Sequence, residues 1–154
     1  MNQDTNQPVW VIGAGLAGCE AAWTLAQQGV AVRLYEMKPQ QYTPAHQYKG
    51  FAELICSNSL KAARIGSAAG MLKEEMRILG ALTMEAAQQT SVSAGGALAV
   101  DRERFSDFIT ERILAHPLLE VVHQRVDHLP EGTGIVASGP LTATFMLPFA
   151  MGAT

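Results

Sequence analysis

Two short apolar runs near the N-terminus predict strands, and a helix-forming segment separates them. Residues 9–12 read Val-Trp-Val-Ile and stop at a glycine, as expected for a strand buried on both faces of a parallel sheet. Residues 19–28 are rich in helix formers and are followed by Gly29, a helix-stop signal. Residues 30–35 predict the second strand. Strand, glycine turn, helix and strand within residues 9–36 are typical of the βαβ unit of a parallel sheet.

The middle of the chain departs from this pattern. Residues 38–66 are rich in proline, glutamine and tyrosine, and we expect an extended loop there with a short ordered piece over residues 51–55. Residues 68–89 predict two helices that are interrupted near Gly80. Together with the glycine-rich stretch that follows, these segments predict a loop and helical excursion over residues 38–100.

The last elements are expected to return to the sheet. Residues 101–115 predict a helix, because Asp101 is a favourable N-cap and apolar residues recur behind it at helical spacing. Residues 118–122 and 134–137 predict further strands. The predicted fold is therefore of the α/β class, a Rossmann-like parallel sheet with flanking helices over residues 8–142, and we expect it to be incomplete.

Composition excludes several classes of protein. Hydrophobic residues make up 48% of the 154 residues and charged residues 16%, against about 25% charged in an average protein, so the chain can build a core. A net charge of −3 argues against nucleic-acid binding through a broad basic surface of this chain alone. Two cysteines without CxxC or zinc-ligand spacing indicate a reducing, cytoplasmic location and no metal site. Residues 132–154 carry no charge, and an atypical apolar tail occupies residues 143–154. Gly139, Pro140 and Pro148 interrupt the uncharged stretch too often for a membrane span.

A glycine-rich turn follows the first predicted strand and opens the first predicted helix. It reads Gly13-Ala14-Gly15-Leu16-Ala17-Gly18, the G-x-G-x-x-G spacing of dinucleotide-binding folds. In such a turn the first glycine permits the bend, the second lets the main chain approach a diphosphate, and the third lets helix and strand pack closely. The free N–H groups at the helix start face the phosphates. We therefore expect these six residues to bind a cofactor.

Glu36, at the end of the second predicted strand, extends this pattern. An acid there accepts hydrogen bonds from ribose hydroxyls and disfavours a 2′-phosphate, which argues against NADP. Lys38 faces either the cofactor's phosphates or adenine, or it faces solvent. Gly139 follows an apolar strand and either lets the backbone pass close to the cofactor or forms an ordinary turn. FAD and NAD share this kind of cradle, so the residues alone leave both cofactors open.

Six blocks of sequence, in order from about residue 9 to residue 142, resemble one family. They are residues 13–23, 35–39, 43–46, 51–60, 94–102 and 138–142. Together they make the chain similar to the folate- and FAD-dependent tRNA (uracil-5-)-methyltransferases. The Cys-Ser-Asn-Ser-Leu and Ala-Gly-Gly-Ala-Leu-Ala-Val-Asp-Arg blocks are far more specific to that family than the glycine motif.

The resemblance implies a Rossmann-like FAD-binding fold and a reaction. In that family 5,10-methylenetetrahydrofolate supplies a one-carbon unit, NAD(P)H reduces the flavin, and a uracil in the T-loop of tRNA gains a C5 methyl group. Cys56 occupies the position to which the family assigns a catalytic part, either attacking uracil or supporting the flavin chemistry. Family members are far longer than this chain. The alternatives are therefore the N-terminal part of such an enzyme, a truncated and inactive dinucleotide-binding module, or a fragment of an NAD-linked oxidoreductase.

If the family resemblance is set aside, several polar residues allow two interpretations. Cys56 is either a small buried residue or a nucleophile, whereas Cys19 is expected to pack where the helix starts. His46 either contacts flavin or substrate or lies in solvent. Arg102 and Arg104 either contact phosphate or are charges on a helix surface.

Overall fold

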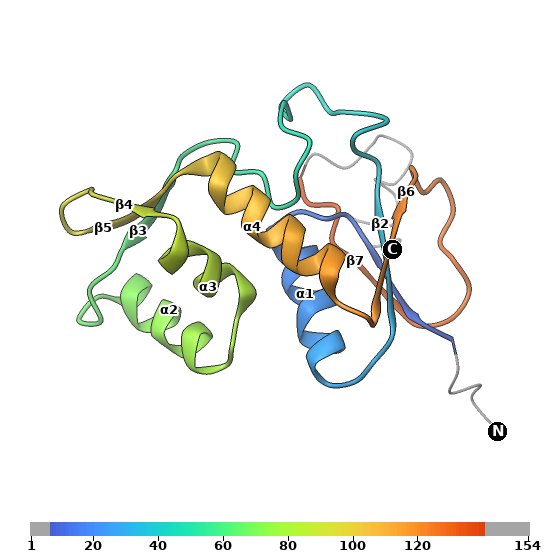
Figure 1. Ribbon diagram of the computed structural model, residues 1–154, viewed down its shortest axis with the longest axis horizontal. Coiled ribbons are helices and arrows are strands. Elements are labelled where there is room, and N and C mark those ends of the chain that lie inside the picture. Colours follow the sequence, from blue (N-terminus) through green and yellow to red (C-terminus); the bar gives the residue numbers. More distant parts are fainter. Residues whose placement is uncertain (1–6, 141–154) are drawn as a thin grey trace, which may run out of the picture.

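Residues 7–140 are described by the computed structural model, and within them four parallel strands form the central sheet (Figure 1). The strands are β1 (Val9–Ile12), β2 (Val32–Glu36), β6 (Leu119–His123) and β7 (Gly134–Val136). Their order is β6-β2-β1-β7, so the sheet changes direction of growth between β1 and β7. In open α/β sheets such a switch point places a crevice outside the carboxyl ends of the strands, where ligands bind.

Small side chains allow helix α1 (Leu16–Gln27) to pack closely on this sheet. Cys19 and Ala22 are fully buried and Ala26 is 3% exposed, all on the face of the helix turned toward the core. On the sheet side Val11 and Leu34 lie opposite one another in the β1–β2 register, and both are fully buried. The apolar run and the helix behind it therefore bury each other, as the sequence pattern predicted.

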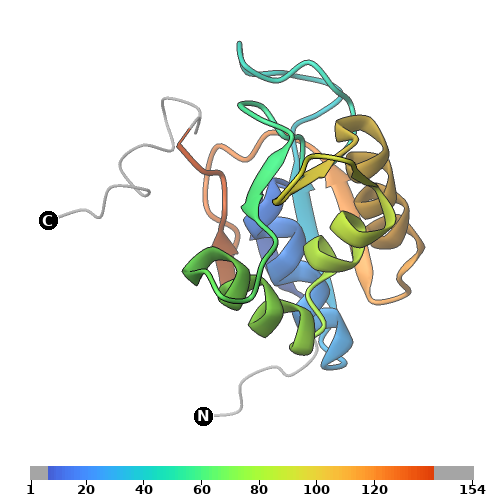
Figure 2. The ribbon, with the colours of Figure 1, turned by 90° about the vertical axis from the view of Figure 1, so that its left-hand side faces the viewer.

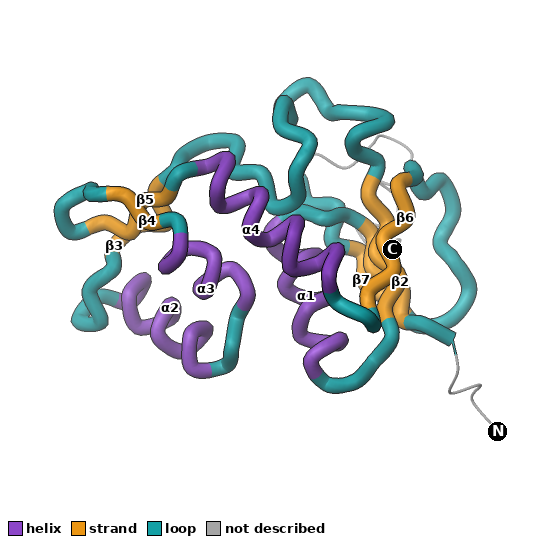
Figure 3. The backbone as a smooth tube through the Cα atoms, viewed as in Figure 1, coloured by secondary structure: helices purple, strands orange, loops and turns teal. Residues whose placement is uncertain are grey.

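The segment of the chain between β2 and β6 forms a second layer, which lies on the side of α1 opposite the central sheet (Figures 1 and 3). It contains helices α2 (Ala68–Ile78) and α3 (Leu82–Gln89), and helix α4 (Arg102–Ala115) leads back to the sheet. A small antiparallel sheet of order β3-β5-β4 joins them, built from β3 (Ser59–Ala62), β4 (Ser91–Val92) and β5 (Ala97–Val100).

One apolar core connects the two layers. Figure 2 looks at the molecule from the side of α2, α3 and the small sheet, with α1 and the central strands behind them. The core contains the large buried side chains of Phe51, Leu82, Phe105 and Ile109, none of which is more than 1% exposed. Glu20 of α1 adds a polar link, because its carboxylate accepts hydrogen bonds from the main-chain N–H groups of the residues that begin α3, at 2.9 and 3.0 Å. A carboxylate at this position caps the helix and complements its dipole.

Most elements lie where the sequence pattern placed them. The break between α2 and α3 at Gly80, which has a positive φ of 77°, is confirmed, and so is the N-cap of α4, where Asp101 accepts a hydrogen bond from Arg104 N at 3.1 Å. The prediction of loop over residues 38–66 is wrong at β3, which pairs with a strand far along the chain. Helix α1 also begins at Leu16, inside the glycine turn and three residues earlier than predicted. The apolar tail, residues 143–154, lies outside the described residues.

The helices of the structure were compared with the requirements of a membrane span. Among residues 7–140 no helix combines the length and the apolar character that a membrane span requires.

Candidate functional site

A cleft of about 340 Å³ opens at the carboxyl ends of the central strands. This volume is at the lower end of the range of small-molecule sites, about 300–1,000 Å³. The glycine turn after β1 and the end of β2 form one side of it. The segments that follow β6 and β7 and the loop between β2 and β3 form the rest, through residues 12–17, 35–38, 124–126 and 137–140 together with Thr43, His46, Glu53 and Ile55.

The three glycines of the turn meet different surroundings. Gly13 has a φ of 98°, and a Cβ atom there would lie 2.9 Å from the Ala137 carbonyl oxygen. A Cβ on Gly18 would lie 1.8 Å from the Gly13 carbonyl oxygen, so this position holds the helix against the turn. A Cβ on Gly15 would meet no atom within 4 Å. Two glycines are thus required by the fold, whereas the third leaves open space beside the cleft.

The start of α1 offers hydrogen-bond donors to this space. Gly15 is the N-cap and contributes no side-chain cap, and no acidic residue lies in the first turn. The first N–H groups of a helix have no partner within the helix, and they carry its partial positive charge. The cleft therefore meets an uncapped, electropositive helix end, which suits an anion such as a phosphate.

Glu36 lies at the base of the same turn. It is 8% exposed, and its carboxylate accepts hydrogen bonds from Ala14 N at 2.8 Å and from Lys38 N at 2.9 Å. An ionised carboxylate has about four lone-pair sites, so these two bonds leave acceptor capacity for ligand hydroxyls. Glu36 both orders the glycine turn and can bind a ribose.

Gly139 lies on the other wall of the cleft. Its φ is 69°, a left-handed conformation that glycine adopts without strain, and a Cβ there would meet no atom within 4 Å. Ala137 N donates to the Ile12 carbonyl at 2.8 Å, which holds this segment beside the glycine turn. Gly139 and the turn therefore face one cleft, which is the arrangement that the first of the two interpretations of Gly139 requires.

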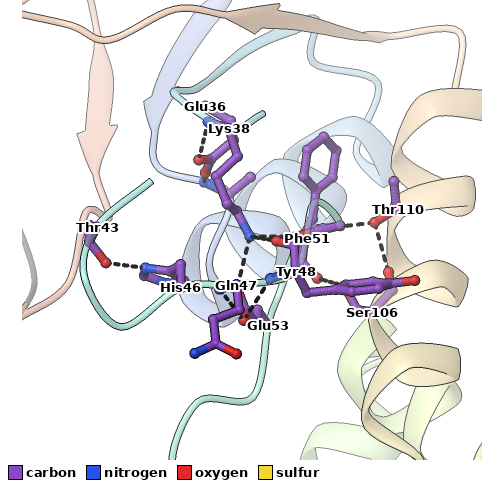
Figure 4. A network of polar contacts seen from close by, with 12 residues as sticks. Glu36, Lys38, Thr43, His46, Gln47, Tyr48, Phe51, Glu53, Ser106 and Thr110 are labelled. Atoms are coloured by element: carbon purple, nitrogen blue, oxygen red, sulfur yellow. Dashed lines mark hydrogen bonds and ion pairs between the residues drawn. The ribbon is translucent and has the colours of Figure 1, made fainter. Parts of the chain in front are cut away.

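Lys38 lines the cleft, but its ammonium group does not serve the role expected from the sequence (Figure 4). The side chain is buried, and Nζ donates to the carbonyl oxygens of Tyr48 at 3.0 Å and Gly50 at 2.6 Å. It also forms an ion pair with Glu53 at 3.3 Å. These three contacts use the three donors of the ammonium group, so Nζ faces neither solvent nor a phosphate: it holds the loop.

Glu53 is the acceptor at the centre of that loop. Its Oε1 atom accepts from Gln47 N at 2.9 Å and from Tyr48 N at 3.0 Å. Burial by itself raises the pKa of the Glu53 carboxyl, but these hydrogen bonds and the charge of Lys38 outweigh it, so the pKa lies below its ordinary value.

Helix α4 fixes the far side of the same loop (Figure 4). Ser106 Oγ donates to the Phe51 carbonyl at 2.5 Å, and Phe51 N donates to Thr110 Oγ1 at 2.8 Å. The Tyr48 hydroxyl donates to Asp107 at 2.7 Å, which raises the pKa of Tyr48 to about 12. The loop between β2 and β3 is therefore anchored at both ends around its cleft-lining part.

The two cysteines lie in opposite environments. Cys19 is fully buried and its thiol donates to the Ala14 carbonyl at 3.3 Å. Burial, and then the negative charges of Glu36 and Glu20, raise the pKa of the Cys19 thiol far above its ordinary value. Cys56 is exposed and has no disulfide partner. It does not line the cleft, although its neighbour Ile55 does.

The remaining polar residues divide between structural and cleft positions. His46 lines the cleft, and its Nδ1 atom lies 2.5 Å from Thr43 Oγ1. Arg102 and Arg104 lie on the exposed surface of α4, away from the cleft. Within residues 7–140 no group of three or more histidine, cysteine or acidic residues could hold a metal ion.

No sequence pattern pointed to two acids that hold segments around the cleft and the core. Glu53 accepts a hydrogen bond from Gln47 N of its own loop, and Glu20 accepts one from Leu82 N, far along the chain. A lone acid in a loop or in the first turns of a helix has no periodic signal, so neither position could be distinguished from a surface charge.

Comparison with known proteins agrees with this geometry. Residues 8–144 match the family model described as glucose inhibited division protein A, GIDA. The methylenetetrahydrofolate--tRNA-(uracil-5-)-methyltransferase TrmFO of Geotalea uraniireducens is 63% identical over 134 residues, which cover 86% of this chain and 31% of that protein. The protein of the same name from Lysinibacillus sphaericus is 58% identical over 139 residues, which cover 90% of this chain and 32% of that protein.

Solved structures support the fold class. The GidA protein of Aquifex aeolicus in its form I crystal superposes with a TM-score of 0.64 at 18% identity, covering 81% of this chain and 21% of that chain. At this identity the likeness concerns the fold alone, and it confirms the Rossmann-like prediction. The chain spans about a third of the length of the curated relatives that it matches. The family model and these relatives confirm the resemblance found in the sequence, and the chain belongs to the GIDA family.

Proposed function

We propose that the cleft binds FAD and that the chain is the FAD-binding, N-terminal part of a tRNA (uracil-5-)-methyltransferase. The observation that carries the proposal is the open space at Gly15, which faces an uncapped helix end beside a buried acid. A volume of about 340 Å³ suits the adenosine diphosphate half of the dinucleotide better than the whole molecule.

Each cradle residue has a role in this proposal. The main-chain N–H groups at the start of α1, over residues 15–18, donate to the diphosphate. Glu36 accepts from the ribose hydroxyls while it holds the glycine turn through Ala14. Gly139 keeps the opposite wall free of side-chain atoms. When bound, FAD would supply the redox chemistry of the reaction.

The names of the relatives support the rest of the proposal. They point to transfer of a one-carbon unit from 5,10-methylenetetrahydrofolate to C5 of a uracil in tRNA. In this proposal NAD(P)H is the reductant of the flavin, tRNA and folate are the partners, and the protein works in the cytoplasm. Because the chain spans 31–32% of these relatives, the full reaction belongs to the longer protein.

Cys56 is proposed as the nucleophilic residue. Its thiol is exposed, so a substrate can reach it without opening the fold. A thiolate that adds to the carbon next to uracil C5 forms a sulfur–carbon bond, and the electron pair of the ring double bond moves to C5. C5 would then form a bond to the one-carbon unit as that unit's bond to the folate nitrogen breaks. C5 then loses its proton, the thiolate leaves, and the reductant would supply the two electrons that bring the one-carbon unit to the methyl level. The buried Cys19 thiol is excluded from this role by its raised pKa and lack of access.

A titration of the chain with FAD tests the proposed function. Binding is followed by flavin fluorescence, and NADH is added as a competitor. We expect saturable FAD binding that Gly15→Val abolishes, because the new side chain enters the cleft. Gly96→Val is the matched control, since Gly96 also has no atom within 4 Å of its Cβ position but does not line the cleft. Equal binding by both variants, or no binding by the unmodified chain, would contradict the proposal.

A second candidate, dinucleotide binding without turnover, is favoured by one observation. Cys56 does not line the cleft within the described residues, so this part of the protein does not by itself bring the thiol to a bound cofactor. Tighter binding of NADH than of FAD would further favour an NAD-linked oxidoreductase fragment over the flavoprotein.

A further inference from the structure

His46 occupies an unusual position for a loop histidine. It lies in the loop between β2 and β3, and it lines the cleft together with Thr43. The ring is oriented by Thr43, whose Oγ1 atom lies 2.5 Å from Nδ1. Within residues 7–140, no hydrogen-bond partner is present for the other ring nitrogen, Nε2.

The hydrogen bond to Thr43 determines what Nε2 can do. In the tautomer in which the Thr43 hydroxyl donates to Nδ1, Nε2 carries the proton. Nε2–H is then a donor, held in one orientation by a neighbour three residues away. A donor at the wall of an anion-binding cleft is complementary to phosphate oxygens.

Charge in the cleft strengthens this argument. Two cationic side chains line it, and both already form ion pairs: Lys38 with Glu53 at 3.3 Å, and Arg125 with Asp127 at 3.0 Å. The Lys38 ammonium has all three of its donors in use. A buried lysine whose donors are all in use cannot turn to a diphosphate, so main-chain N–H groups and other polar side chains of the cleft gain importance for binding it.

The loop that carries His46 is held in place on both sides. Lys38 and Glu53 join its two ends, and Glu53 accepts from Gln47 N directly after His46. Ala52 N donates to the Ala14 carbonyl at 2.8 Å, which ties the loop to the glycine turn itself. A donor on this loop is thus held in fixed relation to the proposed diphosphate position without the cost of ordering a mobile segment.

We propose that His46 is a ligand-binding residue of the cleft, whose Nε2–H donates to the diphosphate of the bound dinucleotide while Thr43 positions the ring. This inference rests on the proposed function, because it requires a dinucleotide in the cleft. It assigns to residues 43–46 a direct part in cofactor affinity, beyond that of the glycine turn and Glu36.

The test compares variants that separate the two ring nitrogens. His46→Asn retains an amide at the position of Nδ1 and removes the donor at Nε2, whereas His46→Gln places an amide N–H near the position of Nε2. We expect His46→Asn to weaken FAD and ADP binding about 10- to 100-fold, the range for a hydrogen bond to a charged acceptor. His46→Gln should restore part of the loss. His128→Asn, in an exposed segment away from the cleft, is the matched control and should bind as the unmodified chain does.

The positioning role of Thr43 has its own readout. Thr43→Val should weaken FAD binding by about three- to fivefold, and Thr43→Ser should restore it, because the hydroxyl and not the methyl group contacts the ring. In nitrogen-15 spectra of the histidine rings, FAD should shift His46 Nε2 while Nδ1 remains an acceptor. Thermal unfolding of every variant shows whether the fold is intact.

The outcomes distinguish this inference from the proposed function. If the unmodified chain binds neither FAD nor ADP, the proposed function fails and the assignment of His46 fails with it. If the chain binds FAD but His46→Asn binds equally well, or the His46 ring signals do not move, only the inference is overturned. A loss with FAD but not with ADP would overturn the assignment to the diphosphate.

Discussion

Glu36 and Ala14 are joined by a hydrogen bond of 2.8 Å between the buried carboxylate and the main-chain N–H of the glycine turn. The same carboxylate accepts from Lys38 N, so one side chain orders the cradle and the start of the loop across the cleft. The residue proposed to bind the ribose is therefore also the residue that shapes the site.

Replacing Glu36 with glutamine should weaken both stability and binding. Two main-chain N–H groups donate to separate oxygens of Glu36, and glutamine offers only one acceptor oxygen. One buried N–H then loses its partner, at a cost of about 1–3 kcal/mol in the free energy of unfolding. Denaturant unfolding and FAD titration measure the two effects. Glu111→Gln, on the exposed surface of α4, is the control and should change neither quantity.

Substitutions at two glycines of the turn should differ in their effect on the free energy of unfolding. A Cβ on Gly18 would meet the Gly13 carbonyl oxygen at 1.8 Å, so Gly18→Ala should destabilise the fold by about 1–3 kcal/mol or more. The alanine side chain of Gly15→Ala would enter open space, so this variant should lower the free energy of unfolding by no more than about 1 kcal/mol, as for loss of a glycine N-cap. Calorimetric unfolding distinguishes them. A Gly18→Ala protein as stable as the parent would show that the helix does not pack on the turn in this way.

The buried Lys38–Glu53 pair should be strongly coupled. Lys38→Met leaves the Glu53 carboxylate without its counter-charge, and removal of one partner of a buried pair costs about 3–5 kcal/mol. In a double-mutant cycle with Glu53→Gln, the two losses should not add. Arg77→Met breaks an exposed pair with Glu74, which solvent screens, and should lower the free energy of unfolding far less than Lys38→Met does. Additive losses for Lys38 and Glu53 would argue that the ion pair does not form.

Acid should weaken the loop through Glu53. Its pKa is lower in the folded chain than in the unfolded chain, so the folded state gains stability above the unfolded pKa of about 4.3 and loses it as the pH falls through the folded pKa. Unfolding measured from pH 6 downward, at roughly half-unit steps, should show a weaker pH dependence in Glu53→Gln. Glu74, whose pKa is also lowered by Arg77, contributes to the slope that remains. An unchanged slope in Glu53→Gln would contradict this assignment.

The two thiols should react at very different rates. Cys56 is exposed, whereas Cys19 is fully buried with a raised pKa, so only Cys56 should react with a thiol reagent in the native chain. Cys19 should react at the rate of unfolding. Cys56→Ser should abolish the fast phase, and Cys19→Ser should leave it unchanged. Two fast-reacting thiols in the folded chain would show that the helix start is open.

Periodic features could be predicted from the sequence, and features made by distant contacts could not. The apolar run of β1 and the glycine turn are local signals, and both define the cleft as predicted. Strand β3 was missed because its four residues, Ser-Leu-Lys-Ala, are too few for their alternation to stand out, and because their partner strand β5 lies more than thirty residues later in the chain. The position of Lys38 stayed open because the sequence does not show the carbonyl oxygens of Tyr48 and Gly50 that accept hydrogen bonds from its ammonium group.

The exposure of Cys56 illustrates the same division. Its polar neighbours suggested a turn, and the structure places it outside helices and strands, on the surface next to cleft-lining Ile55. Its assignment as a nucleophile came from the family resemblance, because no local pattern distinguishes a reactive cysteine from a small surface residue. The site could thus be located from the sequence, but the contacts that hold it required the structure.

Main-chain amide shifts measured during a titration with FAD test the central claim most directly. If the cradle binds the diphosphate, the amide signals of residues 13–18 and of Gly139 should shift together and saturate, while those of the remote β4–β5 hairpin stay in place. Saturable FAD binding that leaves the residue 13–18 signals unmoved, or no binding at all, would contradict the account.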